Sequence, residues 1–447
     1  MTNRREFLKK MAMGTAALSV GGVLPGFSAE SYKNIVGANE KIRIGGMGVN
    51  SRGLAITRGL AFEKSCEVNG ICDVDSRAQR KAIAEVEKYA GNTPKAYTDI
   101  RKMLESKDFD ALYIATPDHW HAPAALMAMQ AGKHVYLEKP TSHSPAENEI
   151  LINAATKYNK VVQVGNQRRS WTNVVRAIEE IRNGTIGNVY YGKGWYTNNR
   201  PSIGTGKVIP VPEWLDWELW QGPAPRVKEF KDNYVHYNWH WFWHWGTGEA
   251  LNNGTHYVDL LRWGMDVDYP TKVTSVGGRY RYQDDWETPD TQVIGFEFGD
   301  KKSFIWEGRS CNGKSTEGFG VGVIFYGEEG SIVIGGGNEY KIYDLKSNLI
   351  KDVTSEMGFE EGNLMSPTQK LDAFHYRNFF DGIRKGTQLN SDLLNGCIST
   401  QLVQLGNISQ RIGRSLNIEP ATGHIINDKE ADKLWTREYE KGWEMKL

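Results

Sequence analysis

The sequence predicts an α/β protein with two domains, a doubly wound parallel sheet followed by an α+β domain with a mostly antiparallel, open sheet. Short apolar runs alternate with helical segments up to residue 165, which is typical of a parallel sheet buried on both faces. From residue 190 onward several longer runs alternate apolar and polar residues, which favours antiparallel strands with one covered face. The chain of 447 residues is long enough to give each domain its own core.

These patterns place the elements in order along the chain. In the first domain we expect strands at 42–47, 67–73, 111–116, 134–137 and 161–164, with helices at 122–131 and 145–158. In the second we expect strands at 190–197, 271–282, 292–298, 302–309, 320–326 and 331–334, and closing helices at 371–384 and 391–412. The predicted organisation is a leader at 1–29, a first domain at 39–165, a second domain at 166–420 and a C-terminal tail at 421–447.

The leader has the features of a twin-arginine export signal. Arg4 and Arg5 open a basic segment, a weakly apolar run covers 11–27, and Ser28 and Ala29 are small residues near a cleavage point. The apolar run is shorter than the ~20 residues that a membrane-spanning helix needs. We therefore predict a periplasmic protein exported through the Tat pathway, with no membrane span in the mature chain and with cleavage of the signal left open.

The first predicted strand runs into a glycine-rich turn that is typical of a dinucleotide site. Gly48 and Gly53 stand at the first and last positions of the Gly-x-Gly-x-x-Gly pattern, with Asn50 at the middle position. Backbone N–H groups of such a turn, and the positive end of the helix that follows, hold a pyrophosphate. This pattern predicts an NAD(P)-binding Rossmann domain.

The second predicted strand ends in an acidic residue, Asp73, twenty residues after the last glycine of the turn. An acid there accepts hydrogen bonds from the ribose hydroxyls and repels a 2′-phosphate, which favours NAD over NADP. Arg52 and Arg77 keep NADP possible. The alternative is that Asp73 caps the next helix, a position that Ser76 suits equally well.

Loops after the later strands are where a doubly wound sheet carries its chemistry, and here they match a known family. Taken together, the motifs resemble those of the Gfo/Idh/MocA sugar oxidoreductases over residues 40–420, in an exported, Bacteroidetes-like branch. The matching motifs are Ala115-Thr116-Pro117 with His119 and His121, Ala131-Gly132-Lys133-His134-Val135 leading into Glu138-Lys139-Pro140, and Gly254-Thr255-His256-Tyr257-Val258-Asp259. The resemblance implies NAD(P) dependence, a catalytic lysine in Glu-Lys-Pro, and an open sheet used as substrate floor and oligomer face.

The cofactor and substrate residues follow from these motifs. The residues predicted to bind the cofactor are Gly48, Asn50, Ser51, Arg52, Gly53, Asp73, Thr116, Pro117, His119, His121, Glu138, Lys139 and Gln167. The residues predicted to contact substrate are Arg168, Trp195, Tyr237, Asn238, Trp239, His240, Asn252 and Asp259. The cofactor is expected to be NAD, with NADP possible.

The predicted catalytic residues are Lys139, His256 and Asn252. The Lys139 ammonium can polarise the reacting hydroxyl, and His256 can remove its proton, with Asp259 one helical turn later to orient the ring. Asn252 stands where the family usually has Asp and cannot take a proton. This leaves Lys139 and His256 as the minimal pair, with Glu249 as a possible substitute acid.

An aromatic-rich stretch precedes His256 and is expected to line the substrate side of the pocket. Flat aromatic rings pack on the apolar faces of sugars, so Trp239, Trp241 and Trp243 are candidate platforms, with packing inside a core as the alternative. His236, His240 and His244 share a spacing of four, but alternating Trp and His residues argue against a helix that would bring them together. No metal site is predicted.

The chain has 54 Lys and Arg residues and 54 Asp and Glu residues, so its formal net charge is zero and does not favour binding to nucleic acid.

We expect an oxidoreductase that transfers hydride between a tightly bound nicotinamide, loaded before export, and a sugar, glycoside or cyclitol hydroxyl. The alternative is a redox-neutral, NAD-dependent glycoside hydrolase or lyase. The uncovered sheet face predicts a homodimer or homotetramer.

Overall fold

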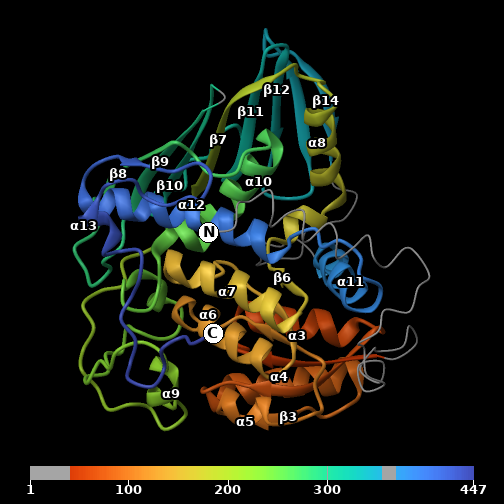
Figure 1. Ribbon diagram of the computed structural model, residues 1–447, viewed down its shortest axis with the longest axis vertical. Coiled ribbons are helices and arrows are strands. Elements are labelled where there is room, and N and C mark those ends of the chain that lie inside the picture. The colour runs from red at the N-terminus through yellow and green to blue at the C-terminus, as the bar shows by residue number, and fades with distance from the viewer. Residues whose placement is uncertain (1–40, 300, 355–368) are drawn as a thin grey trace. The chain divides into compact units, whose positions relative to one another are not determined.

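The computed structural model describes residues 41–299, 301–354 and 369–447. The predicted leader lies outside these residues. The described part forms one compact unit with two sheets (Figure 1).

The first sheet is parallel and has six strands in the order β3-β2-β1-β4-β5-β6. Its strands are β1 (Ile42–Met47), β2 (Cys66–Cys72), β3 (Lys95–Tyr97), β4 (Ala111–Ile114), β5 (His134–Leu137) and β6 (Val162–Val164). The central strands β1, β4 and β5 are almost wholly buried, because helices cover both faces. From β1 the chain first adds β2 and β3 on one side and then crosses to add β4, β5 and β6 on the other side. The carboxyl ends of the strands border a crevice at such a switch point, between β1 and β4.

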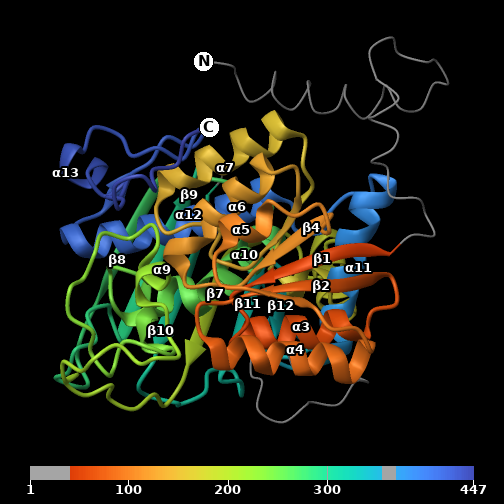
Figure 2. The ribbon, with the colours of Figure 1, turned by 90° about the horizontal axis from the view of Figure 1, so that it is seen from below.

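Helices cover both faces of this sheet. Figure 2 shows α3 (Arg52–Phe62) and α4 (Ser76–Ala90) on one side of β1 and β2, and α6 (Asp118–Gln130) and α7 (Pro145–Tyr158) on the other, with the short α5 (Ile100–Leu104) beside α6. A capping box formed by Ser144 and Glu147 starts α7. Asp75 rather than Ser76 caps α4, accepting the N–H groups of Arg77 and Ala78. The helix predicted at 122–131 starts at Asp118, four residues early.

The second sheet has nine strands in the order β14-β13-β12-β11-β7-β10-β9-β8-β15, and it is antiparallel except where β7 pairs with β10. Its strands are β7 (Val189–Thr197), β8 (Lys272–Gly278), β9 (Thr291–Phe298), β10 (Lys302–Arg309), β11 (Val321–Gly327), β12 (Gly330–Ile334), β13 (Tyr340–Asp344), β14 (Leu349–Val353) and β15 (Leu416–Asn417). The prediction of a mostly antiparallel sheet is confirmed. The strand predicted at 271–282 ends at Gly278, and the edge strands β13 and β14 were not predicted.

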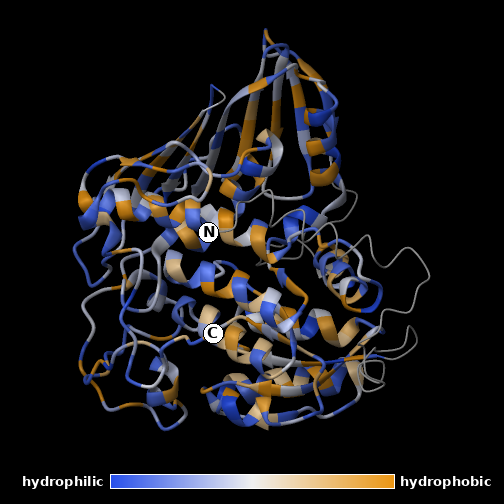
Figure 3. Ribbon diagram, in the orientation of Figure 1, coloured by the Kyte–Doolittle hydropathy of each residue, from blue (hydrophilic) through white to orange (hydrophobic). Residues whose placement is uncertain are grey.

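Helices pack on one face of this second sheet. They are α8 (Thr172–Arg182), α10 (Thr255–Met265) and α12 (Leu393–Ile412), while α11 (Gln369–Lys385) lies against α3 of the first domain. Figure 3 shows apolar residues along the strands and on the covering helices. The opposite face carries a small cluster around Trp195, Ile324 and Val333.

The stretch from residue 198 to residue 246, here called the aromatic segment, links β7 to the helices before α10. It has only short helices, α9 (Trp217–Gln221) and the 3₁₀ turn η2 (Asn238–Trp241), and it forms its own core around Trp217, Trp220 and Trp245. Two backbone hydrogen bonds fix it to the loop after β2: Ser76 N donates to Trp214 O over 2.9 Å, and Asp216 N donates to Val74 O over 3.0 Å. The aromatic segment therefore bridges the two domains beside the crevice.

The predicted C-terminal tail packs against the first domain after the short helix α13 (Lys429–Asp432). Arg437 pairs with Glu147 of α7 at 2.7 Å, and Trp443 stacks edge-on against Trp120 of α6. Among the described helices none is both long enough and apolar enough to cross a membrane.

Candidate active site

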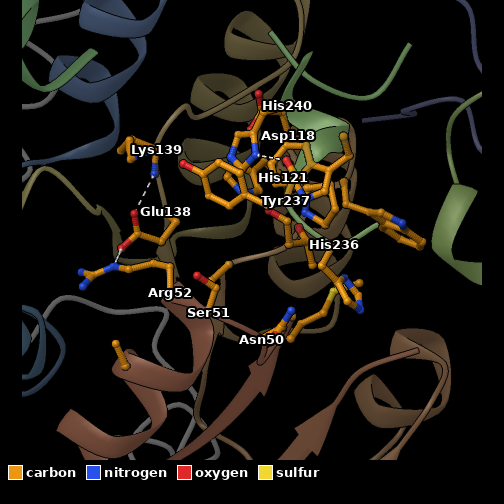
Figure 4. Close-up of a pocket in the computed structure, with 18 of the residues that line it drawn as sticks. Asn50, Ser51, Arg52, Asp118, His121, Glu138, Lys139, His236, Tyr237 and His240 are labelled. Carbon is orange, nitrogen blue, oxygen red and sulfur yellow. Dashed lines mark hydrogen bonds and ion pairs between the residues drawn. The ribbon is translucent and has the colours of Figure 1, made fainter. Parts of the chain in front are cut away.

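A cavity of about 740 Å³ occupies the crevice at the carboxyl ends of the parallel strands (Figure 4). The loops of the Rossmann domain line one part of it, and the aromatic segment and the end of β7 line a second part. The π-helical turn η3 (Ala250–Gly254), α10 and α11 supply the remaining lining residues. A single cavity thus joins the predicted cofactor loops to the predicted substrate wall.

The glycine-rich turn forms a cradle that side chains would fill. Gly48 has φ +76°, and a Cβ there would lie 2.7 Å from the N atom of Thr116. A Cβ on Gly53 would lie 1.8 Å from the carbonyl oxygen of Gly48, so only glycine lets α3 approach the strand this closely. Asn50 and Ser51 line the cavity between them. This geometry fits the pyrophosphate of a dinucleotide at the N-terminus of α3.

Asp73 follows β2 and lines the same cavity. Its carboxylate accepts hydrogen bonds from Val49 N at 2.7 Å and Asp75 N at 2.8 Å, and burial raises the pKa of Asp73. Both nearby arginines are already engaged. Arg77 pairs with Asp75 at 2.9 Å and stacks on Trp214, while Arg52 binds two carboxylates. These contacts fit the ribose hydroxyls of NAD better than the 2′-phosphate of NADP.

Lys139 lies in the turn after β5, where its side chain enters the cavity. The Nζ atom donates to the carbonyl oxygen of Asn252 over 2.6 Å. Burial lowers the pKa of Lys139, and the charges of Glu138 and Asp118, which raise it, offset this effect only in part. His121 stabilises the turn that carries Lys139, because its two ring nitrogens lie within hydrogen-bond distance of the Pro140 and Thr116 carbonyl oxygens.

A polar network centred on Glu249 supports the substrate wall. Arg200 pairs with the Glu249 carboxylate at 2.7 Å and donates to the Tyr237 hydroxyl at 3.0 Å. The Asn252 amide donates to Glu249 at 3.2 Å and to Tyr237 at 3.3 Å, and Ser310 donates to Glu249 at 3.0 Å. Glu249 therefore orders the wall and is not a free acid.

His256 lines the cavity near Lys139. Burial lowers the pKa of His256 well below its ordinary value, and the fields of Lys139, Arg168 and Arg52 add to this effect. Asp259 does not orient the ring, because its carboxylate binds Arg169 at 2.7 and 2.8 Å. At neutral pH the imidazole is uncharged and can accept a proton.

The structure brings most of the predicted site residues together and separates others from the cavity. The predicted residues that line it are Gly48, Asn50, Ser51, Arg52, Asp73, Thr116, Pro117, His121, Glu138, Lys139, Gln167, Tyr237, Trp239, His240, Asn252 and His256. Gly53 packs beneath the cradle.

Besides Gly53, five residues predicted to touch ligand do not line the cavity. Trp195 is on the uncovered sheet face and donates to Phe319 O, and His119 binds Trp220 O behind α6. Asn238 binds the Asn233 carbonyl, Asp259 pairs with Arg169, and Arg168 is buried against Trp171 and Tyr257. The partners of Trp195, His119 and Asp259 are distant in sequence, which local motifs do not reveal.

The candidate platforms also differ from one another. Trp239 lines the cavity and stacks on His240, whereas Trp241 is buried and stacks on Trp286. Trp243 does not line the cavity and lies under the guanidinium of Arg411. Of the three, only Trp239 is placed to meet a ligand.

Sequence reasoning missed several lining residues, namely Asp118, Tyr196, Asn198, Arg200, Leu219, Trp220, Asp372 and Tyr376. Asp118 stands in the Thr-Pro-Asp motif and could have been selected from it. Burial raises the pKa of Asp118, against the opposing field of His121 and a hydrogen bond from Thr247. Asp372 and Tyr376 come from α11, for which the sequence gives no local sign.

The three evenly spaced histidines point to separate partners. His236 pairs with Asp75 at 2.8 Å, His240 binds Tyr237 O at 2.6 Å, and His244 binds Pro225 O at 2.7 Å. Across residues 41–299, 301–354 and 369–447 no three His, Cys, Asp or Glu side chains gather in a geometry suited to a metal ion.

Comparison with known families agrees with this geometry. The profile of the oxidoreductase family with an NAD-binding Rossmann fold matches residues 42–166, and the profile of its C-terminal alpha/beta domain matches residues 202–445. The chain belongs to the Gfo/Idh/MocA oxidoreductase family. Its first domain is therefore an NAD-binding Rossmann domain, which agrees with the cradle and Asp73 described above.

Curated relatives include a glycosyl hydrolase family 109 protein of Saccharopolyspora erythraea, 29% identical over 47% of this chain and 49% of the relative. They also include an alpha-N-acetylgalactosaminidase of Shewanella oneidensis, 26% identical over 43% of this chain and 46% of the relative. The chain spans about half the length of these curated relatives.

Solved structures share the fold over most of the chain. A levoglucosan dehydrogenase in complex with NADH is 17% identical, with a TM-score of 0.65 over 85% of this chain and 100% of that one. The WlbA dehydrogenase of Bordetella pertussis, in complex with NADH and UDP-GlcNAcA, is 20% identical, with a TM-score of 0.63 over 85% and 99%. At these identities the likeness concerns the fold.

Proposed function

We propose that the protein is an NAD-dependent oxidoreductase that acts on a hydroxyl-bearing carbon of a sugar, glycoside or cyclitol. The observation that carries this proposal is the position of Lys139. Its buried ammonium lies where the cofactor cradle meets the polar wall of Tyr237 and Asn252, within one cavity. The sugar-related names of several relatives and neighbours support the same substrate class.

The residues of the chain divide the work at the reacting carbon. The bound nicotinamide supplies the hydride acceptor or donor. The Lys139 side chain binds the reacting hydroxyl and polarises it, and the neutral His256 imidazole accepts the hydroxyl proton. Asn252 holds the Lys139 ammonium through its carbonyl and orients Tyr237 through its amide, so it positions groups without taking a proton.

The aromatic segment supports tight retention of the cofactor. It bonds through its backbone to residues 74–76 directly after Asp73, and the His236 ring lies within hydrogen-bond distance, 2.8 Å, of the Asp75 carboxylate. On the other side of the crevice, the ring nitrogens of His119 and Trp120 both lie 3.0 Å from Trp220 O. We infer that these contacts, which hold the aromatic segment against the cradle side of the cavity, slow the release of a bound dinucleotide, and this favours loading before export and reoxidation in place.

A redox-neutral, NAD-dependent glycoside hydrolase or lyase is the second candidate. The names of the curated relatives favour it, and retention of the cofactor fits a cycle in which the sugar ring is oxidised and then restored. Both candidates use the same cavity and the same Lys139.

We also propose export through the Tat pathway to the periplasm, on the strength of Arg4 and Arg5 and the apolar run that follows. The face of the second sheet opposite the helices, where the partly buried Phe319, Tyr326 and Tyr343 lie against the buried Trp195, Ile324 and Val333, is the proposed face of a homodimer or homotetramer. Retention of an Arg4→Lys, Arg5→Lys variant in the cytoplasm would test the first proposal, and light scattering of the purified protein would test the second.

One experiment separates the two chemical candidates. The protein is purified after export, its bound nucleotide is extracted from a portion, and the rest is incubated with a panel of sugars and glycosides without added cofactor. A keto-sugar formed with matching NADH indicates a dehydrogenase, whereas free sugar released without net NADH indicates the redox-neutral hydrolase. If protein that carries nucleotide forms neither a keto-sugar nor free sugar from any substrate of the panel, both candidate functions are contradicted.

A further inference from the structure

Asp75 is a buried acid in the loop between β2 and α4, and it does not line the cavity itself. Its backbone N–H donates to the Asp73 carboxylate over 2.8 Å, and its own carboxylate caps α4 and pairs with Arg77 at 2.9 Å. The same carboxylate lies 2.8 Å from the Nε2 atom of His236, which stands 161 residues away in the sequence. Asp75 therefore joins the acid assigned to the cofactor ribose to the aromatic segment.

The chemistry of the two groups defines the contact between Asp75 and His236. Burial raises the pKa of Asp75, but the hydrogen bonds from Arg77 and His236 outweigh this effect and hold the pKa below its ordinary value. An ionised carboxylate only accepts hydrogen bonds, so the Nε2 atom of His236 carries a hydrogen and donates it. Hydrogen bonds to charged groups are among the stronger ones in proteins. The Asp75 side chain is only 3% exposed, so water competes little with the ring for it.

His236 lies where the aromatic segment borders the cofactor half of the cavity (Figure 4). Its ring lines the cavity together with Asp73 and Val74, which follow β2, and with Leu219 and Trp220 of the aromatic segment. A nucleotide held by Asp73 would therefore have the loop after β2 and the aromatic segment as walls of the same space.

Further contacts hold the same junction. The guanidinium of Arg77 lies 3.4 Å from a ring centroid of Trp214, and the His236 ring packs against the same indole with 5.8 Å between centroids. The backbone of Trp214 accepts a hydrogen bond from Ser76 N over 2.9 Å. Two stretches of the aromatic segment, around Trp214 and around His236, thus converge on the loop that follows β2.

We propose that the hydrogen bond between Asp75 and His236 is a latch, which holds the aromatic segment closed over the adenosine end of bound NAD and sets how slowly the nucleotide leaves. His236 forms part of the wall. Asp75 is a positioning residue that acts through Asp73 and His236. The inference rests on the retention of cofactor in the proposed function, and it is independent of whether the reaction yields a keto-sugar or free sugar.

The test measures how fast bound NAD leaves the intact protein. The protein is produced in cells supplied with radiolabelled nicotinic acid, excess unlabelled NAD is added, and the label that stays with the protein is followed by gel filtration. His236→Phe keeps a ring beside Trp214 and removes the donor, and we expect it to release NAD at least ~tenfold faster than the wild type. Asp75→Asn keeps a side chain that caps α4 and weakens the same hydrogen bond, so it should also release NAD faster, by a smaller factor.

His424→Phe is the matched control. His424 also lies beside a carboxylate, 3.1 Å from that of Glu149, and it stacks on a tryptophan, Trp435. None of these three residues lines the cavity. We therefore expect His424→Phe to release NAD at a rate close to that of the wild type.

The outcomes separate the inference from the proposed function. Equal release from His236→Phe and the wild type, or equal acceleration in His424→Phe, would overturn the latch. Faster release from Asp75→Asn alone would also overturn it, because the effect would then belong to the cap of α4. The absolute rate tests retention instead: wild-type protein that loses its NAD within minutes would contradict reoxidation in place, and the ratio between the variants would still decide the latch.

Discussion

Replacing Glu249 by Gln should destabilise the protein far more than the same change at an exposed ion pair. The Glu249 side chain is 3% exposed and Arg200 is 16% exposed, so the substitution leaves a buried guanidinium without its carboxylate. Removing one partner of a buried pair costs about 3–5 kcal/mol. The loss should also loosen Tyr237 and Asn252, which share the network, and lower kcat.

Glu297→Gln is the matched control. Glu297 pairs with Lys272 at 3.2 Å between β9 and β8 of the second sheet, where the two side chains are 59% and 41% exposed. Such a pair contributes about 0–1 kcal/mol. Urea unfolding of both variants, followed by circular dichroism, measures the difference, and adding Arg200→Met to Glu249→Gln should recover part of the loss. Equal destabilisation by Glu249→Gln and Glu297→Gln would refute the central place given to Glu249.

Three further changes test other parts of the structure. Gly53→Ala should abolish retention of nucleotide on gel filtration, because the added Cβ would meet the Gly48 carbonyl oxygen. Gly313→Ala, whose Cβ would make only ordinary contacts, is the control and should retain the nucleotide. Equal retention by the two variants would contradict the assignment of the glycine-rich turn as the cofactor site. Asn252→Asp should lower kcat at least tenfold, because a carboxylate would face Glu249 in place of the amide that donates to it, and an unchanged rate would contradict the positioning role. Burial lowers the pKa of His375 to about 4, below the unfolded value near 6.5, so the unfolded chain binds more protons between these values. Its contribution to the unfolding free energy is therefore present above pH ~6.5 and is lost toward pH ~4, by about 3 kcal/mol, and His375→Gln should flatten this dependence in urea titrations.

The parallel sheet and the cofactor cradle could be predicted because their signals are local. The strand at 134–137 and the helix at 145–158 match β5 and α7 residue for residue, since apolar runs and a capping box define them. Gly48, Gly53 and Asp73 follow from one short motif and the strand after it. Lys139 follows from its position at the end of a strand.

The substrate wall could be predicted only in part because its geometry depends on distant partners. Arg200 reaches Glu249 across 49 residues, and Asp259 binds Arg169 across 90 residues. Neither pairing leaves a periodic pattern in the sequence. The same reason hid the bonds between the aromatic segment and residues 74–76. Trp195, which was predicted to contact substrate, lies instead on the face of the second sheet opposite the helices.

The most direct test of the central claim is transfer of deuterium from a sugar carbon to the bound nicotinamide. Nucleotide-loaded protein is incubated with a panel of perdeuterated sugars and glycosides, and the extracted nucleotide is analysed by mass spectrometry, with Lys139→Met as the comparison. When the reaction is stopped within the first turnover, before the hydride can return to the substrate, we predict deuterium on the nicotinamide with at least one substrate under either candidate chemistry, and a loss of at least tenfold in Lys139→Met. Loaded wild-type protein that acquires no deuterium, or acquires it equally without Lys139, would contradict the account.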